Sequence, residues 1–491
     1  MKSRGAPLRW LPVLALLACS LHALAQPDPP LRVGSLSAIE GSVVAAPAGD
    51  TEWNEAPMNR PLTPGDRLWT DPRARADVHL GTATLHVDSE TFLEMRLLDE
   101  RLLQAVLREG ALQARVRTLA SGELFEIDTP QLAFRALEPG TYRIDADPAR
   151  RITRVTVREG AASVSGSSGR TLTLYPGQQL EVGGADLDRI ASVSYADNGF
   201  DRWAAERNAR DDQSVAARFV PDLVGSVQLD AYGTWSQDPA YGMVWYPAAV
   251  GRDWAPYRSG RWQWIKPWGW TWIDNAPWGF APFHYGRWAF IGSRWAWVPG
   301  RLGSRPAYAP ALVAFVGGGA AGPLSLGSAE AIAWYPLAPG EPWRPFFGAS
   351  AAYLRRVNQS AASGAASPDG HLHRASIDAV TALPIGDFRS GEPVQRHWGR
   401  PHPADLARAQ PLLPPAASSA RNLTGPSMTA GLPAPAWAGE RPRVPATKPR
   451  AAAAAARPQH HAAGANAQQK GPWRVPRPSS GLDDDGSHRR P

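Results

Sequence analysis

The sequence has one cysteine, Cys19, so disulfides and thiol chemistry are excluded from the chain beyond that residue. Long apolar runs are also missing. Residues 309–316 form one of the longest, and they end at a glycine cluster. A helix needs about 20 apolar residues to span a bilayer. We therefore expect no transmembrane span.

Recognisable catalytic or metal-binding patterns are missing as well. His371 and His373 have no Cys, Asp or Glu at ligand spacing, and Gly317 to Gly319 lack the Lys-Ser/Thr signature of a phosphate loop. Asp483 to Asp485 do not follow a calcium-loop pattern. We expect no enzyme activity, no cofactor and no metal.

The net charge of +7 is confined to one end of the chain. Residues 421–491 contain eleven Lys or Arg and four acidic residues, so their net charge of +7 equals that of the whole chain. The rest is near neutral, which removes the usual electrostatic reason to expect nucleic-acid binding.

The N-terminus predicts export. Lys2, Arg4 and Arg9 form a positive segment, residues 11–17 are apolar, and small residues precede a cleavage site between Ala25 and Gln26. Residues 1–25 are therefore a predicted signal peptide of a periplasmic protein. The alternative is a lipobox ending at Cys19, which predicts a lipoprotein anchored in the outer membrane.

Residues 31–185 consist of short alternating runs bounded by Gly, Pro, Asp or Ser, which predicts an antiparallel β domain. Arg-Glu-Gly-Ala occurs at residues 108–111 and again at 158–161, with a weaker copy at 40–43. Glycine in these positions predicts hairpin turns with positive φ.

This segment resembles the FecR domain of bacterial proteins that sense or relay signals in the periplasm, through residues 64–70, 75–80, 125–130, 140–145, 157–161 and 176–178. The iron-transport regulator of that name also has a cytoplasmic segment and a transmembrane helix. In this chain the β domain directly follows the predicted signal peptide, so we do not infer that it contacts a sigma factor.

Three further segments are predicted around the folded parts. Residues 186–225 are a helical linker, with a helix over 201–209 acting as a spacer. Residues 348–400 are a poorly defined linker region. Residues 401–491 are a disordered basic tail rich in Pro and Ala, which either contacts anionic lipid headgroups and wall polymers or only aids solubility.

Residues 226–347 form a tryptophan-rich repeat region. Of the 21 tryptophans, 14 lie between Tyr232 and Phe346. A Gly-X-Trp motif begins at Gly233, Gly260 and Gly286, and each copy has a second tryptophan at nearly fixed distance: Trp245, Trp272 and Trp297. A partial fourth copy includes Trp334. Alternation at period two predicts tandem β-hairpins, one with its turn at Lys266-Pro267, so the whole chain is predicted to be all-β.

Two interpretations of the tryptophans remain open at this point. They form the core of the region, or some of them line a groove with basic residues at its rim. The candidate aromatic and basic binding surface comprises Trp254, Tyr257, Arg261, Trp268, Trp278, His284, Arg287 and Arg294, with Arg258 also at the rim.

The region also resembles a proteobacterial tryptophan-rich family of uncharacterised function that often accompanies a FecR-like domain, through residues 253–257, 267–272, 277–288 and 308–312. We expect a non-enzymatic envelope binding or scaffold protein that contacts an envelope glycan or a partner protein. The alternative is a FecR-type signalling component that relays an envelope state to a membrane partner.

Overall fold

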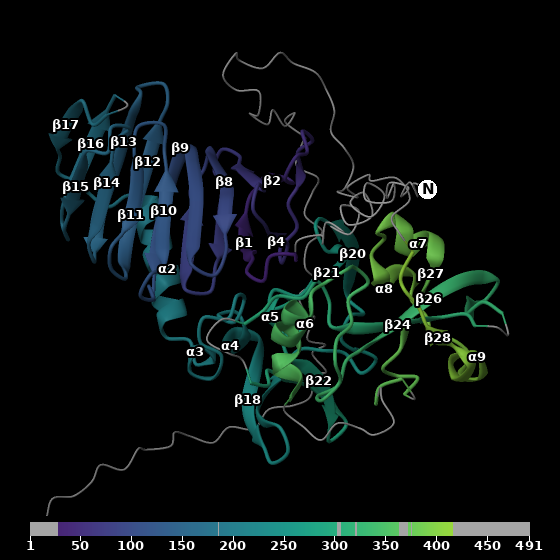
Figure 1. Ribbon diagram of the computed structural model, residues 1–491. Coiled ribbons are helices and arrows are strands. Elements are labelled where there is room, and N and C mark those ends of the chain that lie inside the picture. The colour runs from purple at the N-terminus through teal and green to yellow at the C-terminus, as the bar shows by residue number, and fades with distance from the viewer. Residues whose placement is uncertain are drawn as a thin grey trace, which may run out of the picture. The chain divides into compact units, whose positions relative to one another are not determined.

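The computed structural model describes residues 28–184, 186–301, 306–319, 322–362, 372–374 and 376–415 (Figure 1). Cys19, Ala25, Gln26 and residues 416–491 of the predicted tail lie outside these residues. The predicted all-β class is confirmed, because strands dominate both the first domain and the tryptophan region. No helix among the described residues is long and apolar enough to cross a membrane.

The first domain contains two sheets that share the long strand β9 (Leu102–Val116). Sheet A runs in the order β4–β1–β6–β7–β9–β12–β13–β16–β17, and all its pairings are antiparallel. Its other strands are β1 (Gly34–Glu40), β4 (Pro61–Leu62), β6 (Arg75–His79), β7 (Ala83–Val87), β12 (Gly140–Asp147), β13 (Ile152–Glu159), β16 (Gln179–Gly183) and β17 (Arg189–Ser192).

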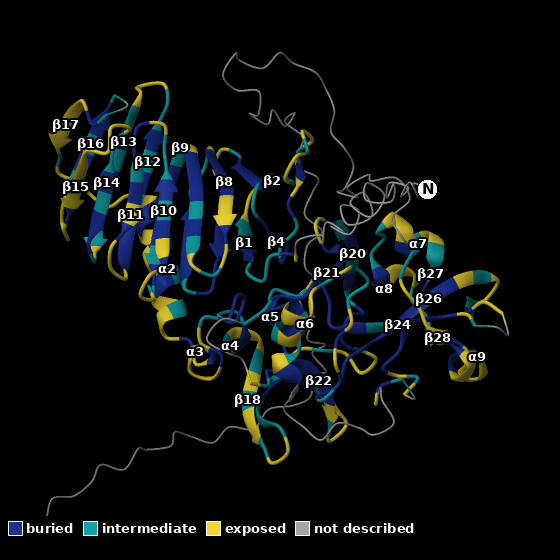
Figure 2. Ribbon diagram, viewed as in Figure 1, coloured by how far each residue is buried: buried dark blue, intermediate teal, exposed yellow. Residues whose placement is uncertain are grey.

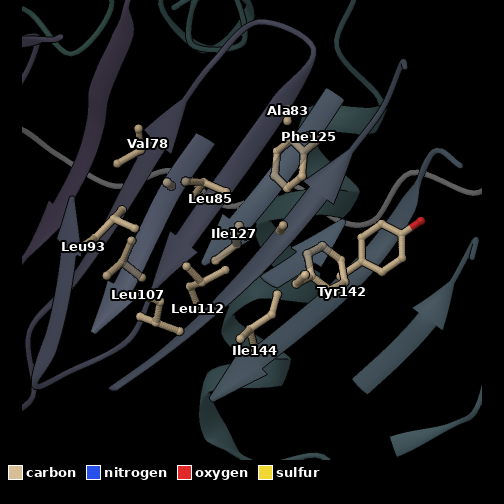
Figure 3. Packing of buried hydrophobic residues seen from close by; sticks show 14 of the residues in the cluster. Val78, Ala83, Leu85, Leu93, Leu107, Leu112, Phe125, Ile127, Tyr142 and Ile144 are labelled. Carbon is tan, nitrogen blue, oxygen red and sulfur yellow. The ribbon is translucent and has the colours of Figure 1, made fainter. Parts of the chain in front are cut away.

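Sheet B runs in the order β3–β2–β5–β8–β9–β10–β11–β14–β15, and only β9 and β10 pair in parallel. One core takes side chains from both sheets, including Leu85 and Ile144 of sheet A and Leu93 and Ile127 of sheet B (Figure 3). Besides β9, the strands of sheet B are β2 (Val43–Ala46), β3 (Asn54–Glu55), β5 (Arg67–Thr70), β8 (Thr91–Leu98), β10 (Leu124–Asp128), β11 (Ala133–Ala136), β14 (Ala162–Ser165) and β15 (Thr171–Leu174).

The repeated Glu-Gly positions lie where the chain passes from one sheet to the other. Gly110 divides β9 into a part paired in sheet B and a part paired in sheet A, with φ of 90°. Gly160, with φ of 79°, stands between β13 of sheet A and β14 of sheet B. The predicted positive φ is confirmed, but the predicted hairpin turns are wrong, because the glycines turn the chain at sheet corners.

Helix α2 (Gly199–Asp212) is longer than the predicted helix, and Asn198 caps it in a capping box with Asp201. It is not a spacer, because it lies on sheet A. Asp201 pairs with Arg143 (2.7 Å) and Arg158 (2.9 Å), and His86 Nε2 lies 2.8 Å from Oδ1 of Asn208. These polar contacts, together with the buried side chains of Phe200 and Ala204, hold the helix on the sheet.

The tryptophan region contains the predicted hairpins. They are β18 (Gly233–Asp238) with β19 (Gly242–Pro247), β20 (Gly260–Ile265) with β21 (Gly269–Asp274), and β22 (Arg287–Ile291) with β23 (Arg294–Val298). Strands β18–β19–β23–β22 form one sheet, sheet C. In each hairpin the repeated tryptophans are directly opposite: Trp235 and Trp245, Trp262 and Trp272, Trp288 and Trp297. Short helices α3 (Ala216–Phe219), α4 (Leu229–Tyr232) and α5 (Ala281–His284) lie before and between the hairpins.

The fold of this region continues beyond its predicted end. Strand β26 (Ala329–Pro336) pairs with β24 (Val313–Gly317), β25 (Ser325–Leu326) and β27 (Thr381–Pro384), and β28 (Gln410–Pro411) pairs with β24. The predicted linker 348–400 and the predicted tail start at 401 are therefore wrong as boundaries. The remaining elements are α6 (Ala351–Val357), a 3-10 helix (Asn358–Ala362), α7 (Ile385–Ser390), α8 (Val394–His397) and α9 (Pro403–Arg408).

Candidate binding surface

The tryptophans are mainly core residues, which confirms the packing interpretation for most of them. Strands β24 and β26 of this region are likewise mostly buried (Figure 2). The tryptophan rings meet edge to face, as in the pair Trp262 and Trp334 at 5.5 Å. Nine tryptophans are among the largest fully buried side chains: Trp245, Trp262, Trp268, Trp270, Trp272, Trp288, Trp297, Trp334 and Trp343.

Five members of the predicted surface are buried, so the prediction of an exposed rim is wrong for them: Tyr257, Trp268, Trp278, His284 and Arg287. The Tyr257 hydroxyl donates to the carbonyl of Phe283 at 2.7 Å and accepts from the amide of Leu312 at 3.1 Å. Burial lowers the pKa of His284 to about 4, so this ring is neutral near neutral pH.

Arg287 is a structural residue. Its guanidinium donates to the carbonyls of Glu341 (3.0 Å) and Gly286 (2.7 Å) and to the side chain of Asn358 (2.9 Å). Burial lowers its pKa to about 10. Arg258 is likewise buried, with its guanidinium 4.1 Å from the centre of the Trp398 ring. Neither arginine is therefore available at a rim.

Three predicted members keep solvent access: Trp254 and Arg261, which are half-buried, and Arg294, which is exposed. Trp254 packs against the rings of Trp278 (5.9 Å) and Trp288 (5.5 Å). The eight residues do not form one groove, because most of them are buried in the core.

The end of the β22–β23 hairpin is the part that remains both aromatic and basic. We call Phe290, Arg294 and Trp295 the β22–β23 tip. Phe290 is 56% exposed and pairs across the hairpin with the half-buried Trp295, at 5.3 Å between ring centres. On the opposite face of the hairpin, the Arg294 guanidinium lies 4.6 Å from the ring centre of Tyr246.

The tip is extended on one side by a short turn. His373 is buried, its ring lies 4.9 Å from that of Trp295, and its Nε2 is 2.9 Å from the carbonyl oxygen of Trp288. Next to it, Leu372 is 49% exposed. The exposed aromatic face can stack on a sugar ring or an apolar side chain, and the Arg294 guanidinium on the other face can donate hydrogen bonds to an acceptor.

Sequence reasoning included Arg294 in the candidate surface but missed Phe290. The available signal was the alternation of Trp288 and Phe290 at period two up to the turn at Gly292. A strand that leaves the core at its end exposes the last residue of its apolar face. Among the described residues, no group of three His, Cys, Asp or Glu could hold a metal ion.

The described fold defines an all-β protein with an aromatic second region. Residues 226–341 match the model of a family of unknown function, DUF6600. No curated protein matches the chain. Two crystal structures of a "putative anti-sigma factor" from Parabacteroides distasonis are similar to it, at 14% and 13% identity, each over 37% of this chain and 99% of the other. Both have a TM-score of 0.25, which does not establish a shared fold.

Proposed function

We propose that this chain is a non-enzymatic binding or scaffold protein of the bacterial cell envelope, which acts in the periplasm and contacts an envelope glycan or a partner protein. The β22–β23 tip is the observation that carries the proposal. Phe290 leaves an aromatic ring open to solvent beside the half-buried indole of Trp295, and Arg294 adds a guanidinium on the other face of the same hairpin end.

The scaffold part of the proposal is supported by contacts between the β domain and the tryptophan region. The Asn59 amide donates to the carbonyls of Asp274 (3.0 Å) and Ala276 (2.7 Å). His79 Nδ1 accepts from the backbone amide of Gly225 at 2.9 Å, and burial lowers the pKa of His79 to about 3, which keeps it a neutral acceptor. Buried polar contacts of this kind favour a fixed arrangement.

The test measures cosedimentation of the full-length chain with purified peptidoglycan sacculi. Replacing Phe290 by Ser and Trp295 by Ala together should weaken binding about tenfold, because central aromatic residues dominate interfaces. Tyr175→Ser is the matched control, since Tyr175 is 57% exposed but lies outside the tryptophan region, and it should bind as wild type.

Equal binding by the double variant and by wild type would refute the tip as the binding surface. In vivo crosslinking from position 290 then separates the two classes of partner. Capture of wall glycan supports the binding protein. Capture of one specific inner-membrane protein favours the alternative, a FecR-type component that relays an envelope state.

A further inference from the structure

Helix α2 is attached to sheet A at a buried histidine, His86 of strand β7. The Nδ1 atom of this ring lies 2.7 Å from Oδ1 of Asp77, which is its direct partner on β6. The Nε2 atom lies 2.8 Å from Oδ1 of Asn208 on α2. The His86 ring therefore connects a carboxylate of the sheet to an amide of the helix.

Both oxygen atoms that face the ring are hydrogen-bond acceptors. A carboxylate has no hydrogen to donate, and the amide of Asn208 is oriented by its nitrogen, which donates to Oε1 of Gln113 at 3.3 Å. Gln113 is the partner of His86 on β9. A neutral imidazole has one N–H group and satisfies only one of these acceptors, whereas an imidazolium has two and satisfies both.

The charges beside the ring favour the same state. Oδ2 of Asp77 accepts from Nη1 of Arg207 at 2.9 Å, and Nη2 of Arg207 donates to Glu40 at 2.6 Å. One guanidinium of α2 is thus shared by two carboxylates of sheet A. These groups carry no net charge only when His86 is protonated, because a neutral ring leaves one negative charge in excess beside the buried Asp77.

The other described ionisable groups on the neighbouring elements are paired or neutral, so they do not replace the charge of His86. The paired groups are Asp211 and Asp212 with Arg117, Asp212 and Glu159 with Arg115, and Arg75 with Asp88. Burial lowers the pKa of His79 to about 3, so that ring is neutral, and burial raises the pKa of Asp211 above its ordinary value. The Trp203 ring meets the His86 ring edge to face at 5.7 Å between centres and has no charge. His86 is therefore the group whose protonation balances Asp77.

From this geometry we propose that His86 is an imidazolium and acts as a pH-dependent switch that holds α2 on sheet A. When the pH rises and the ring releases one proton, the remaining hydrogen stays on Nδ1, because the charged Asp77 is the stronger acceptor. Nε2 then presents a lone pair to Oδ1 of Asn208, and the contact with the helix is lost. The stabilisation of α2 by this contact is therefore present at low pH and lost at high pH. In the chain α2 lies between the β domain and the tryptophan region, so the switch acts on the segment that connects them.

Hydrogen exchange measured by mass spectrometry over residues 199–212 of the full-length chain tests the switch. A pH series from about 5 to about 9 covers the range in which a histidine changes charge, and each rate is corrected for the intrinsic effect of pH on exchange. The protection of α2 should fall about tenfold across the series, because a hydrogen bond to a charged group is lost. His86→Gln stays neutral, so its protection should be low at every pH. His397→Gln is the matched control, since that ring on α8 is 47% exposed, and its protection should fall as that of wild type does.

Asn208→Asp should change the switch in the opposite direction. A second carboxylate beside His86 keeps the ring protonated, so the fall in protection should begin at a higher pH than in wild type. This variant decides the test if His86→Gln fails to fold. Constant protection in wild type, the same fall in His86→Gln as in wild type, or an unshifted fall in Asn208→Asp overturns the proposal. None of these residues belongs to the β22–β23 tip, so the switch and the proposed function can fail separately.

Discussion

The indole of Trp272 lies against the Cα of Gly260 across the β20–β21 hairpin. A β-carbon on Gly260 would stand 2.6 Å from Cζ2 of Trp272. The same relationship joins Gly286 to Trp297, where the β-carbon would stand 2.7 Å from Nε1. The repeated Gly-X-Trp motif therefore has a physical cause, since the second tryptophan of each copy occupies the space that a side chain would fill.

Gly260→Ala should lower the free energy of unfolding by about 1 to 3 kcal/mol, because its methyl group overlaps the Trp272 ring and the carbonyl of Ile273. Gly251→Ala is the control, since no atom lies within 4 Å of a β-carbon there. Urea unfolding measures both. Equal stabilities of the two variants would contradict the overlap.

Trp297→Ala should cost about 3 to 5 kcal/mol, because the fully buried indole donates to the carbonyl of Tyr285 at 2.9 Å and packs within sheet C. Trp270→Ala should cost a similar amount. Trp295→Ala should cost clearly less, since its ring is half-buried. Thermal melts followed by circular dichroism check the order, and a larger loss for Trp295→Ala would contradict it.

The two arginines of the repeated Gly-Arg-Trp motif should behave differently. Arg287→Gln should cost about 3 kcal/mol, because it leaves buried carbonyl acceptors without the charged donor. Arg261→Gln should change stability by less than about 0.5 kcal/mol, since that side chain is partly exposed. Chemical unfolding of the two single variants tests this directly, and equal losses would refute it.

Asp274 should make stability depend on pH. Burial raises its pKa from 3.8 to about 7, although the Trp272 indole and the Ala276 amide donate to it. Because the folded pKa is raised, the folded state binds more protons than the unfolded state between these values. Stability from this group is therefore full below about pH 4 and lost as the pH rises to about 7, by roughly 4 kcal/mol at most.

Asp274→Asn removes this dependence, so the variant should gain stability relative to wild type between about pH 4.5 and about pH 8. Comparing the two chains at each pH cancels the opposite trend of the buried His79, whose pKa is lowered. A difference that stays constant with pH would show that Asp274 does not titrate in this range.

Asp201→Asn should destabilise the chain by about 3 kcal/mol, because it removes one partner of a buried ion-pair group with Arg143 and Arg158. Hydrogen exchange over α2 should rise in the same variant, since these contacts hold the helix on sheet A. Glu206→Gln, an exposed change on the same helix, is the control and should leave both measurements unchanged.

Local patterns in the sequence were sufficient to predict the strands and hairpins. Alternation at period two predicts β20 and β21 with the turn near Lys266, and the spacing of Trp262 and Trp272 places them opposite each other. These features depend on residues that are close together in the chain, so they can be predicted from the sequence alone. The same reasoning predicted positive φ at Gly110 and Gly160.

Only the tertiary structure decided which side chains reach solvent. Arg261 and Arg287 occupy the same place in their repeats, yet only Arg287 is enclosed, by Glu341 and Asn358 from a distant part of the chain. Gly110 stands at a sheet corner because β9 pairs with β8 before this residue and with β12 after it, and these strands are far apart in sequence. Burial depends on such long-range packing, so it cannot be predicted from the periodicity within a repeat.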